Sequence, residues 1–281
     1  MNHNSRIRFA DLELARRLEM TDALAAVEFA RSWARLNSFT GNSFIAVAGG
    51  YGGFGGVESP LTQAFGLGLT GPVTEDDMSA IEEFYNSNGA PVNIESCPLA
   101  DMSLLTLFNA RGYRPIEYSN VFARELTDAD KTSWPDSGSA VSVRSAREDE
   151  IENYSLVVMK SFLPDTELPT SLLNVFTSCF HAVGASFFLA EIDGVTAGGG
   201  MMSIHQGVAS FGGAGTLTEF RNRGVQKALL LARLAMAAEQ KCDLAMVATA
   251  PGSGSQRNVE RQGFRVVYTR TKFMRELPKT E

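Results

Sequence analysis

The feature that most constrains this chain of 281 residues is an internal repeat. Leu107–Leu126 reads LFNARGYRPIEYSNVFAREL, and Asn258–Leu277 reads NVERQGFRVVYTRTKFMREL. The two segments align without a gap when Gly112 is placed on Gly263, an offset of 263 − 112 = 151 residues, and both end in F-x-R-E-L. Each copy reads as a helix, a glycine that ends it, an aromatic residue and a strand. An offset of about one domain length predicts a chain of two related halves.

A polar, turn-rich segment over Thr127–Ala140 follows the first copy and contains Pro135 and Gly138. This composition is typical of a linker. We therefore expect a first domain over residues 1–126, a linker over 127–140 and a second domain over 141–281.

Composition excludes several kinds of partner. With 25 basic and 32 acidic residues the net charge is −7, which argues against nucleic acid, because that partner needs many basic contacts to phosphate. No stretch approaches 18 consecutive apolar residues and the first residues are charged, so we expect neither a membrane partner nor a secretory signal. The three cysteines match no metal-ligand spacing, and no metal is expected. These features predict a cytoplasmic protein, and they leave open whether it is a monomer or a homodimer.

Hydrophobic periodicity in the second half predicts the element order βααβββαβαβ. Strands are expected over 141–144, 187–192, 195–204, 207–217, 244–249 and 265–275, and helices over 149–162, 168–182, 224–241 and 255–262. Asp193-Gly194 is a favoured two-residue hairpin turn. Meandering strands followed by a strand–helix–strand crossover predict an α/β (α+β) fold, in which a mixed, mainly antiparallel sheet is flanked by helices.

The segment that bears most on chemistry lies between a strand ending at Leu217 and a helix starting at Gly224. Unpaired N–H groups and the positive end of the dipole make a helix start an anion site. Gly224 has no Cβ to keep a phosphate from the backbone, and Arg221, Arg223 and Lys227 add positive charge. The pattern predicts a cradle for phosphate or pyrophosphate, with an ordinary solvated helix start as the alternative.

Arg221-x-x-Gly224-x-Gln226 resembles the [QR]-x-x-G-x-[GA] loop of the GCN5-related N-acetyltransferases (GNATs), with Gln226 in place of Gly or Ala. The strand, SQRNVERQGF at Ser255–Phe264 and final strand that follow are also similar to that superfamily. By this resemblance the loop amides hold the pyrophosphate of acetyl-CoA, and the preceding strand, with GGAG at 212–215, pairs with the pantetheine arm. The resemblance places the following residues around the cofactor: Gly215, Thr216, Leu217, Arg221, Arg223, Gly224, Val225, Gln226, Lys227, Ser255 and Asn258.

The resemblance implies an acetyl-CoA-dependent N-acetyltransferase whose acceptor is a primary amine of a small molecule or peptide. Many GNATs carry a tyrosine four residues before the G-F pair to protonate the leaving thiolate, and this position holds Val259. The strand over 207–217 offers no carboxylate as a base. Glu191, His205 and Tyr268 remain as candidates, and the catalytic residues stay unknown. A CoA-binding pseudoenzyme or regulatory module without turnover is therefore the alternative.

A second glycine-rich segment, GYGGFG at Gly50–Gly55, matches G-x-G-x-x-G of dinucleotide-binding proteins. Such a site needs a helix to open at the third glycine, and the residues that follow include Pro60, Gly66 and Gly68. We expect a glycine-rich hairpin, and a nucleotide site is the third alternative. The other elements expected in the first half are helices over 12–36, 75–87 and 101–111 and strands over 44–48, 65–69 and 92–95.

The first half lacks the phosphate loop. Thr70 to Pro98 spans 28 positions and Thr218 to Pro251 spans 33, so five residues are missing there. Thr74-Glu75-Asp76-Asp77 stands in its place, and these carboxylates repel a pyrophosphate. The resemblance thus implies two GNAT-like domains in tandem, the first a degenerate copy without cofactor. We expect the halves to pack as two subunits of a GNAT dimer do, with the first half shaping the acceptor cleft.

Overall fold

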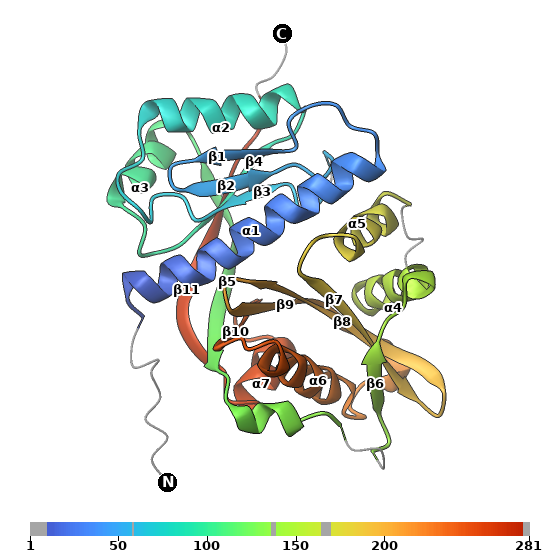
Figure 1. Cartoon of the computed structure of the whole chain (residues 1–281). Helices are drawn as coiled ribbons and strands as arrows, with labels where there is room; N and C mark the ends of the chain where they lie inside the picture. Colours follow the sequence, from blue (N-terminus) through green and yellow to red (C-terminus); the bar gives the residue numbers. More distant parts are fainter. Residues whose placement is uncertain (1–9, 58, 136–138, 164–169, 278–281) are drawn as a thin grey trace. The chain divides into compact units, whose positions relative to one another are not determined.

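The structure is a computed structural model of the chain, and it describes residues 10–57, 59–135, 139–163 and 170–277 (Figure 1). The chain forms two compact units. The C-terminal unit spans Phe122–Arg265, and the N-terminal unit combines Phe9–Val121 with Val266–Glu281. These units differ from the expected division at 127–140, because the last strand of the second half belongs to the N-terminal unit.

The second half of the chain has the element order that periodicity predicts, and all of its elements except the last strand lie in the C-terminal unit. The elements of this unit are the 3₁₀ helices η1 (Asp128–Thr132), η2 (Glu148–Glu150) and η3 (Thr218–Phe220), the α-helices α4 (Ile151–Phe162), α5 (Thr170–Phe180), α6 (Val225–Glu239) and α7 (Gly254–Arg261), and the strands β6 (Ser142–Ser145), β7 (Ala185–Ile192), β8 (Val195–His205), β9 (Val208–Thr216) and β10 (Leu244–Thr249). The expected linker contains η1, which packs on α6, and its Asp130 is buried in an ion pair with Arg124.

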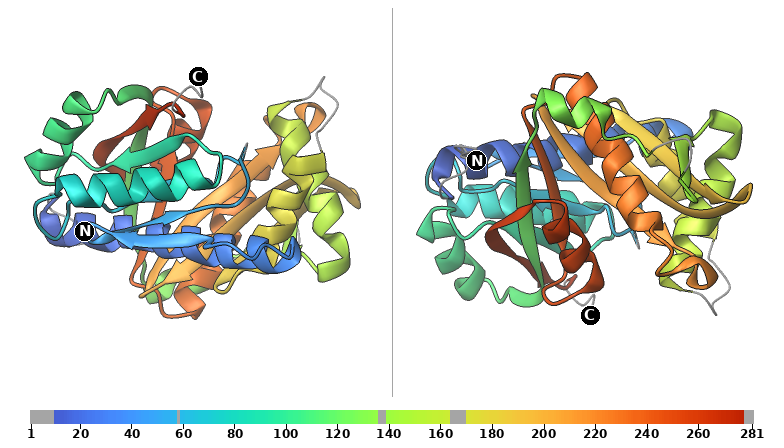
Figure 2. Two further views of the ribbon diagram at one scale, coloured as in Figure 1. Left: turned by 90° about the horizontal axis from the view of Figure 1, so that it is seen from above. Right: turned by 90° about the horizontal axis from the view of Figure 1, so that it is seen from below.

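The sheet of this unit has the order β5-β10-β9-β8-β7-β6. Strands β6 to β9 pair antiparallel and β10 pairs parallel with β9, which confirms the mixed, mainly antiparallel sheet. A Cβ at Gly199 would meet Tyr154 of α4, and a Cβ at Gly200 would meet Arg233 of α6. Because consecutive strand residues point to opposite faces, α4 and α6 cover opposite faces of β8. These strands and helices can be followed from two further directions in Figure 2.

The N-terminal unit contains a similar set of elements: α1 (Leu12–Leu36), β1 (Phe44–Val47), β2 (Gly50–Gly53), β3 (Gln63–Phe65), α2 (Glu75–Ser87), β4 (Val92–Ser96), α3 (Met102–Ala110), the first part of β5 (Arg114–Glu125) and β11 (Arg265–Arg275). Its sheet has the order β1-β2-β3-β4-β11-β5. The chain's last strand, β11, pairs antiparallel with β4, with Phe273 opposite Ile94. Phe273 also stacks on Phe108 of α3, with ring centroids 4.5 Å apart.

Two expectations for this unit have different outcomes. GYGGFG lies in an antiparallel hairpin of β1 and β2, which confirms the glycine-rich hairpin. The expected strand over 65–69 is wrong, because β3 ends at Phe65. Gly66 and Gly68 turn the chain there, with φ of +79° and +75°, angles that glycine adopts far more readily than other residues.

No helix among the residues that the structure describes has the length and apolar character needed to cross a membrane. Within the same ranges, no group of three or more His, Cys, Asp or Glu side chains is arranged to hold a metal ion.

Candidate cofactor site

Strand β9 carries a bulge near its end. Along the pairing with β8, Gly199 lies opposite Gly215 and Met201 lies opposite Gly212, so β9 has one residue more than β8 over this stretch. Gly213 has a φ of +48°, in the left-handed region. A bulge of this kind bends its strand and increases the local twist. The run GGAG therefore supplies the backbone freedom that the sequence led us to expect.

Beyond the bulge, β9 has an edge that β10 does not cover. The parallel register of the two strands ends at Phe211↔Val247, whereas β9 continues to Thr216. Leu217 donates its N–H to the carbonyl of Ala197 in β8 at 3.0 Å. Because N–H groups alternate sides along a strand, the N–H of Thr216 points away from β8, towards the uncovered edge. Thr216 is thus placed to pair with an extended ligand, while the N–H of Leu217 is engaged within the sheet.

Helix α6 begins beside this edge, and no side chain caps it. Gly224 precedes the helix with a φ of +88°, and nothing lies within 4 Å of the place that a Cβ would occupy. Helices α1, α2, α3 and α7, by contrast, are each capped by a side-chain oxygen. The first N–H groups of α6 therefore keep their capacity to bind an anion at the positive end of the dipole.

The side chains of Val225 and Gln226 fix this helix start. Val225 is buried in the core of the unit. The Nε2 of Gln226 donates to Oγ1 of Thr216 at 2.8 Å, which ties the first turn of α6 to the end of β9. The residue that departs from the GNAT motif thus has a structural partner, and its backbone N–H still belongs to the uncapped first turn.

Three exposed basic side chains lie around the start of α6. The Nη2 of Arg221 donates to the carbonyl of Ser161 at the end of α4, at 2.8 Å. The Nη2 of Arg223 is 3.9 Å from Oδ2 of Asp193, both side chains being largely exposed. Lys227 follows in the first turn and is exposed. Exposed ion pairs stabilise by roughly 0–1 kcal/mol, so the contact with Asp193 does not prevent Arg223 from meeting an anion.

Helix α7 packs on α6 and β10. Ser253 caps it by accepting a hydrogen bond from the N–H of Gln256 at 3.1 Å. Ser255 is exposed and Asn258 is half-buried, and their spacing of three residues puts them on one face. Val259 is buried in the core, so an apolar packing residue fills the position at which many GNATs carry a tyrosine.

The structure gives other roles to the three candidate catalytic side chains. The Oε1 of Glu191 is 2.7 Å from Nη2 of Arg144, in an ion pair at the edge strands. His205 is the last residue of β8 and lies opposite Val208 at the start of β9, roughly 17 Å from Gly213 at about 3.3 Å per residue. Tyr268, expected in the second half, belongs to the N-terminal unit because β11 pairs with β4. Its buried hydroxyl donates to Oε1 of Glu19 at 2.7 Å.

The sequence reasoning missed three buried polar side chains beside the glycine-rich parts of β8 and β9. Tyr154 and Ser161 lie on α4, and Arg233 lies on α6. A Cβ at Gly215 would be 1.8 Å from Oγ of Ser161, so the approach of α4 requires a glycine there. The available signal was the helical period of α4, which puts Tyr154, Val158 and Ser161 on one face.

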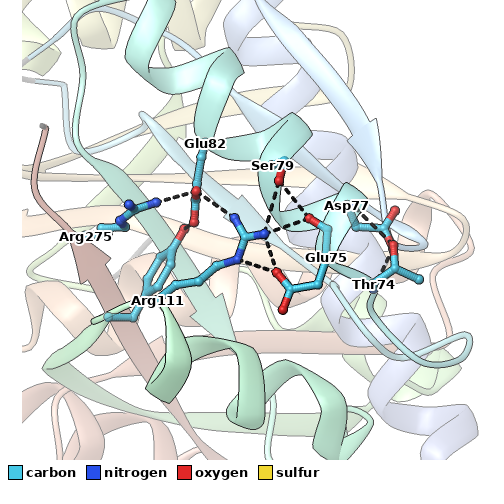
Figure 3. A network of polar contacts seen from close by, with 8 residues as sticks. Thr74, Glu75, Asp77, Ser79, Glu82, Arg111 and Arg275 are labelled. Atoms are coloured by element: carbon cyan, nitrogen blue, oxygen red, sulfur yellow. Dashed lines mark hydrogen bonds and ion pairs between the residues drawn. The ribbon is translucent and has the colours of Figure 1, made fainter.

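The corresponding helix start in the N-terminal unit is closed by the protein's own groups (Figure 3). Thr74 Oγ1 accepts from the N–H of Asp77 at 3.1 Å, and Oδ2 of Asp77 accepts from the N–H of Thr74 at 2.9 Å, a capping box at α2. Hydrogen bonds from Thr74 lower the pKa of Asp77, so this carboxylate is charged at neutral pH. Glu75 and Asp76 add two more carboxylates to the first turn. Their charge disfavours an anion.

The basic side chains near α2 are paired with its carboxylates (Figure 3). Arg111 donates from Nε to Oε2 of Glu75 and from Nη1 to Oε2 of Glu82, each at 2.9 Å. It also donates from Nη2 to Oγ of Ser79 at 3.1 Å. Arg275 pairs with Glu82 as well. The positive charges of Arg111 and Arg275 are therefore neutralised by carboxylates of the same unit.

The chain that follows β3 is also hydrogen-bonded to the protein. The N–H of Gly68 donates to the carbonyl of Ala48 at 3.0 Å, and its carbonyl accepts from the N–H of Asp101 at 2.8 Å. The carbonyl of Leu69 accepts from Nε of Arg16 at 2.6 Å. The backbone groups that correspond to the uncovered edge of β9 thus have protein partners in this unit.

Among known proteins, the chain is similar to solved structures. No family model and no curated protein matches the chain. A GCN5-related N-acetyltransferase from Kribbella flavida is similar over 93% of this chain and 95% of its own, with a TM-score of 0.64 and 16% identity. A tandem GNAT protein from the clavulanic acid biosynthesis pathway is similar over 94% of this chain and 97% of its own, with a TM-score of 0.57 and 14% identity.

A GCN5-related N-acetyltransferase from Sphaerobacter thermophilus is similar over a shorter span, 68% of this chain and 62% of its own, with a TM-score of 0.51 and 18% identity. At such identities the likeness is one of fold, and with the first two proteins it extends over both halves of the chain. The chain therefore has the GNAT fold, in the tandem form that two copies in one polypeptide make.

Proposed function

We propose that this protein is an acetyl-CoA-dependent N-acetyltransferase that transfers the acetyl group to a primary amine of a small molecule or peptide. The C-terminal unit binds the cofactor, and the N-terminal unit is a degenerate copy that does not. The observation that carries the proposal is the uncapped start of α6, with Gly224 open to approach, beside the uncovered edge of β9.

In this proposal the successive parts of acetyl-CoA contact α6, β9 and α7. Its diphosphate accepts from the first N–H groups of α6, with Arg223 and Lys227 supplying positive charge. Its pantetheine arm pairs with Thr216 along the uncovered edge of β9. Ser255 and Asn258 on α7 contact the part of the cofactor beyond the diphosphate.

The reaction is an aminolysis of a thioester. The amine nitrogen forms a bond with the carbonyl carbon, the C–S bond breaks, and coenzyme A leaves as a thiolate while the amine loses a proton to water. The protein holds the two reactants in line, and backbone N–H groups near the bulge of β9 face the developing oxyanion.

Isothermal titration of the full chain with coenzyme A should give one site per chain, because the start of α2 has its own cap and three carboxylates. Two equivalent sites per chain would contradict the assignment of a degenerate N-terminal copy. No binding of coenzyme A or acetyl-CoA at millimolar concentration would end the proposed function.

Turnover is tested by thiol release from acetyl-CoA across a panel of amines, amino acids and aminoglycosides. Release that depends on an amine supports the transferase. Binding with no release on the whole panel would favour a CoA-binding module, which Val259 and the lack of a carboxylate on β9 motivate.

A further inference from the structure

The bulge of β9 is held by a buried tyrosine. Tyr154 of α4 is fully buried, and its hydroxyl donates to the carbonyl of Gly213 at 2.5 Å. A Cβ at Gly213 would come within 3.0 Å of that hydroxyl oxygen, and one at Gly199 within 2.8 Å of the tyrosine ring. Glycines at both positions therefore let the ring lie against the sheet at the bulge. Burial raises the pKa of Tyr154, so the hydroxyl keeps its proton and remains a donor.

A buried arginine holds the same place from the other face. Arg233 of α6 donates from Nη1 to the carbonyl of Met201 at 3.2 Å and from Nε to the carbonyl of Leu229 at 3.0 Å. Met201 is the residue of β8 at which the register shifts. Burial lowers the pKa of Arg233 to about 10, and the side chain is still charged at neutral pH. Its guanidinium carbon lies 4.9 Å from the ring centroid of Phe211.

We propose that Tyr154 and Arg233 are positioning residues of the acyl-transfer site: from opposite faces they hold the carbonyls of Gly213 and Met201 and so fix the bulge that presents the β9 backbone to the thioester. The inference rests on the proposed function for its catalytic meaning, although the clamp itself belongs to the free protein. A carbonyl held at the bulge fixes the peptide plane to which it belongs, and the Gly213 carbonyl therefore fixes the direction of the N–H group of Ala214. Donors fixed in advance stabilise an oxyanion better than donors that must reorient.

The test is Tyr154→Phe in the full chain, with Tyr85→Phe as a matched control. Tyr85 is also fully buried, and its hydroxyl donates to the carbonyl of Gly53, a strand glycine of the N-terminal unit, at 3.3 Å. Each variant removes one buried hydroxyl that donates to a glycine carbonyl. Two properties are measured: amide hydrogen exchange at residues 212–216, and the kcat and KM for thiol release from acetyl-CoA, with the Kd of coenzyme A.

Tyr154→Phe should raise exchange at the bulge and lower kcat, each by about tenfold, the effect of losing one hydrogen bond of roughly 1.4 kcal/mol. The Kd of coenzyme A should stay within about twofold, because α6 is untouched. Tyr85→Phe should change none of these values. Arg233→Met, which removes the second donor and the buried charge together, should also raise exchange at the bulge.

Unchanged exchange in Tyr154→Phe overturns the proposal, and so does a weaker Kd with an unchanged kcat, because the hydroxyl would then serve binding. An equal fall of kcat in Tyr85→Phe overturns it as well, since the effect would be one of general stability. If the wild-type protein releases no thiol, the proposed function fails and the exchange measurement alone decides on the clamp.

Discussion

Gly224→Glu is expected to weaken the binding of coenzyme A by about 100-fold or more. The side chain would enter the open space in front of the first turn of α6 and bring a carboxylate to where the diphosphate accepts. Two like charges about 4 Å apart repel by roughly 1 kcal/mol in bulk water and about 4 kcal/mol near a protein surface, and about 2.7 kcal/mol corresponds to 100-fold. Isothermal titration with coenzyme A measures the change.

The matched control is Gly89→Glu. Gly89 follows α2 in the N-terminal unit and has a φ of +69°, and the place that a Cβ would occupy there also has nothing within 4 Å. Both variants therefore suffer the same left-handed strain, about 1–2 kcal/mol, and gain the same charge. Gly89→Glu should bind coenzyme A like the wild type. Equal loss of affinity in both variants, or full affinity in Gly224→Glu, would show that the start of α6 is not the diphosphate site.

Arg270→Met is expected to lower the free energy of unfolding of the N-terminal unit by about 3–5 kcal/mol, the range found when one partner of a buried ion pair is removed. Arg270 is 3% exposed, and it donates from Nε at 3.0 Å and from Nη2 at 2.8 Å to Oε1 of Glu19, which is fully buried. Without the guanidinium, Glu19 keeps the hydrogen bond from Tyr268 and loses its countercharge. Urea denaturation, followed by fluorescence, measures the change.

The pH dependence of this variant has a definite sign. Burial raises the pKa of Glu19 above its usual value of 4.5, and Arg270 works against that rise. Removing Arg270 raises the pKa of Glu19 further. A carboxyl group whose pKa is higher in the folded than in the unfolded protein makes the fold less stable as the pH rises through the folded-state pKa. The stability that Arg270→Met loses relative to the wild type should therefore be smallest below about pH 4.5.

Two further variants separate the buried charge from other effects. Lys131→Met removes an exposed partner of Asp128 and should leave the free energy of unfolding nearly unchanged, because solvent screens an exposed ion pair. Glu19→Met combined with Arg270→Met should recover most of the lost stability, because replacing both members of a buried pair by apolar side chains is often neutral or stabilising. A single Arg270→Met variant as stable as Lys131→Met at neutral pH would show that the pair contributes little.

The sequence predicted the elements of the second half of the chain well, because the amphipathic period of a helix and the turns at glycines are local properties. The bounds of β10 and β11 agree with the expected ones, and α6 starts immediately after Gly224. The partner of β11 could not be predicted in the same way. The repeat gives both halves the same helix–glycine–strand ending, so the local pattern fits either sheet, and the choice depends on distant contacts such as Phe273 with Phe108.

For the candidate site too, local features could be predicted from the sequence and contacts between distant residues could not. Its backbone features could be predicted from the sequence, because a glycine before a helix and a run of glycines in a strand indicate particular backbone conformations. The residues that hold that backbone were missed. Tyr154 and Arg233 lie in ordinary amphipathic helices, and only the packing of α4 and α6 on β8 shows which carbonyls they meet.

The position of β11 between β4 and β5 has a consequence for synthesis on the ribosome. The strand begins 265 − 125 = 140 residues after β5 ends, which takes roughly 7–28 s at about 5–20 residues per second. Until β11 emerges, the position between β4 and β5 in the nascent sheet is unfilled. Glu19 of α1 also lacks its ion-pair partner Arg270 during this time. The earlier half of the polypeptide thus completes its folding only after the later half has been translated, and holdase chaperones have that interval in which to bind it.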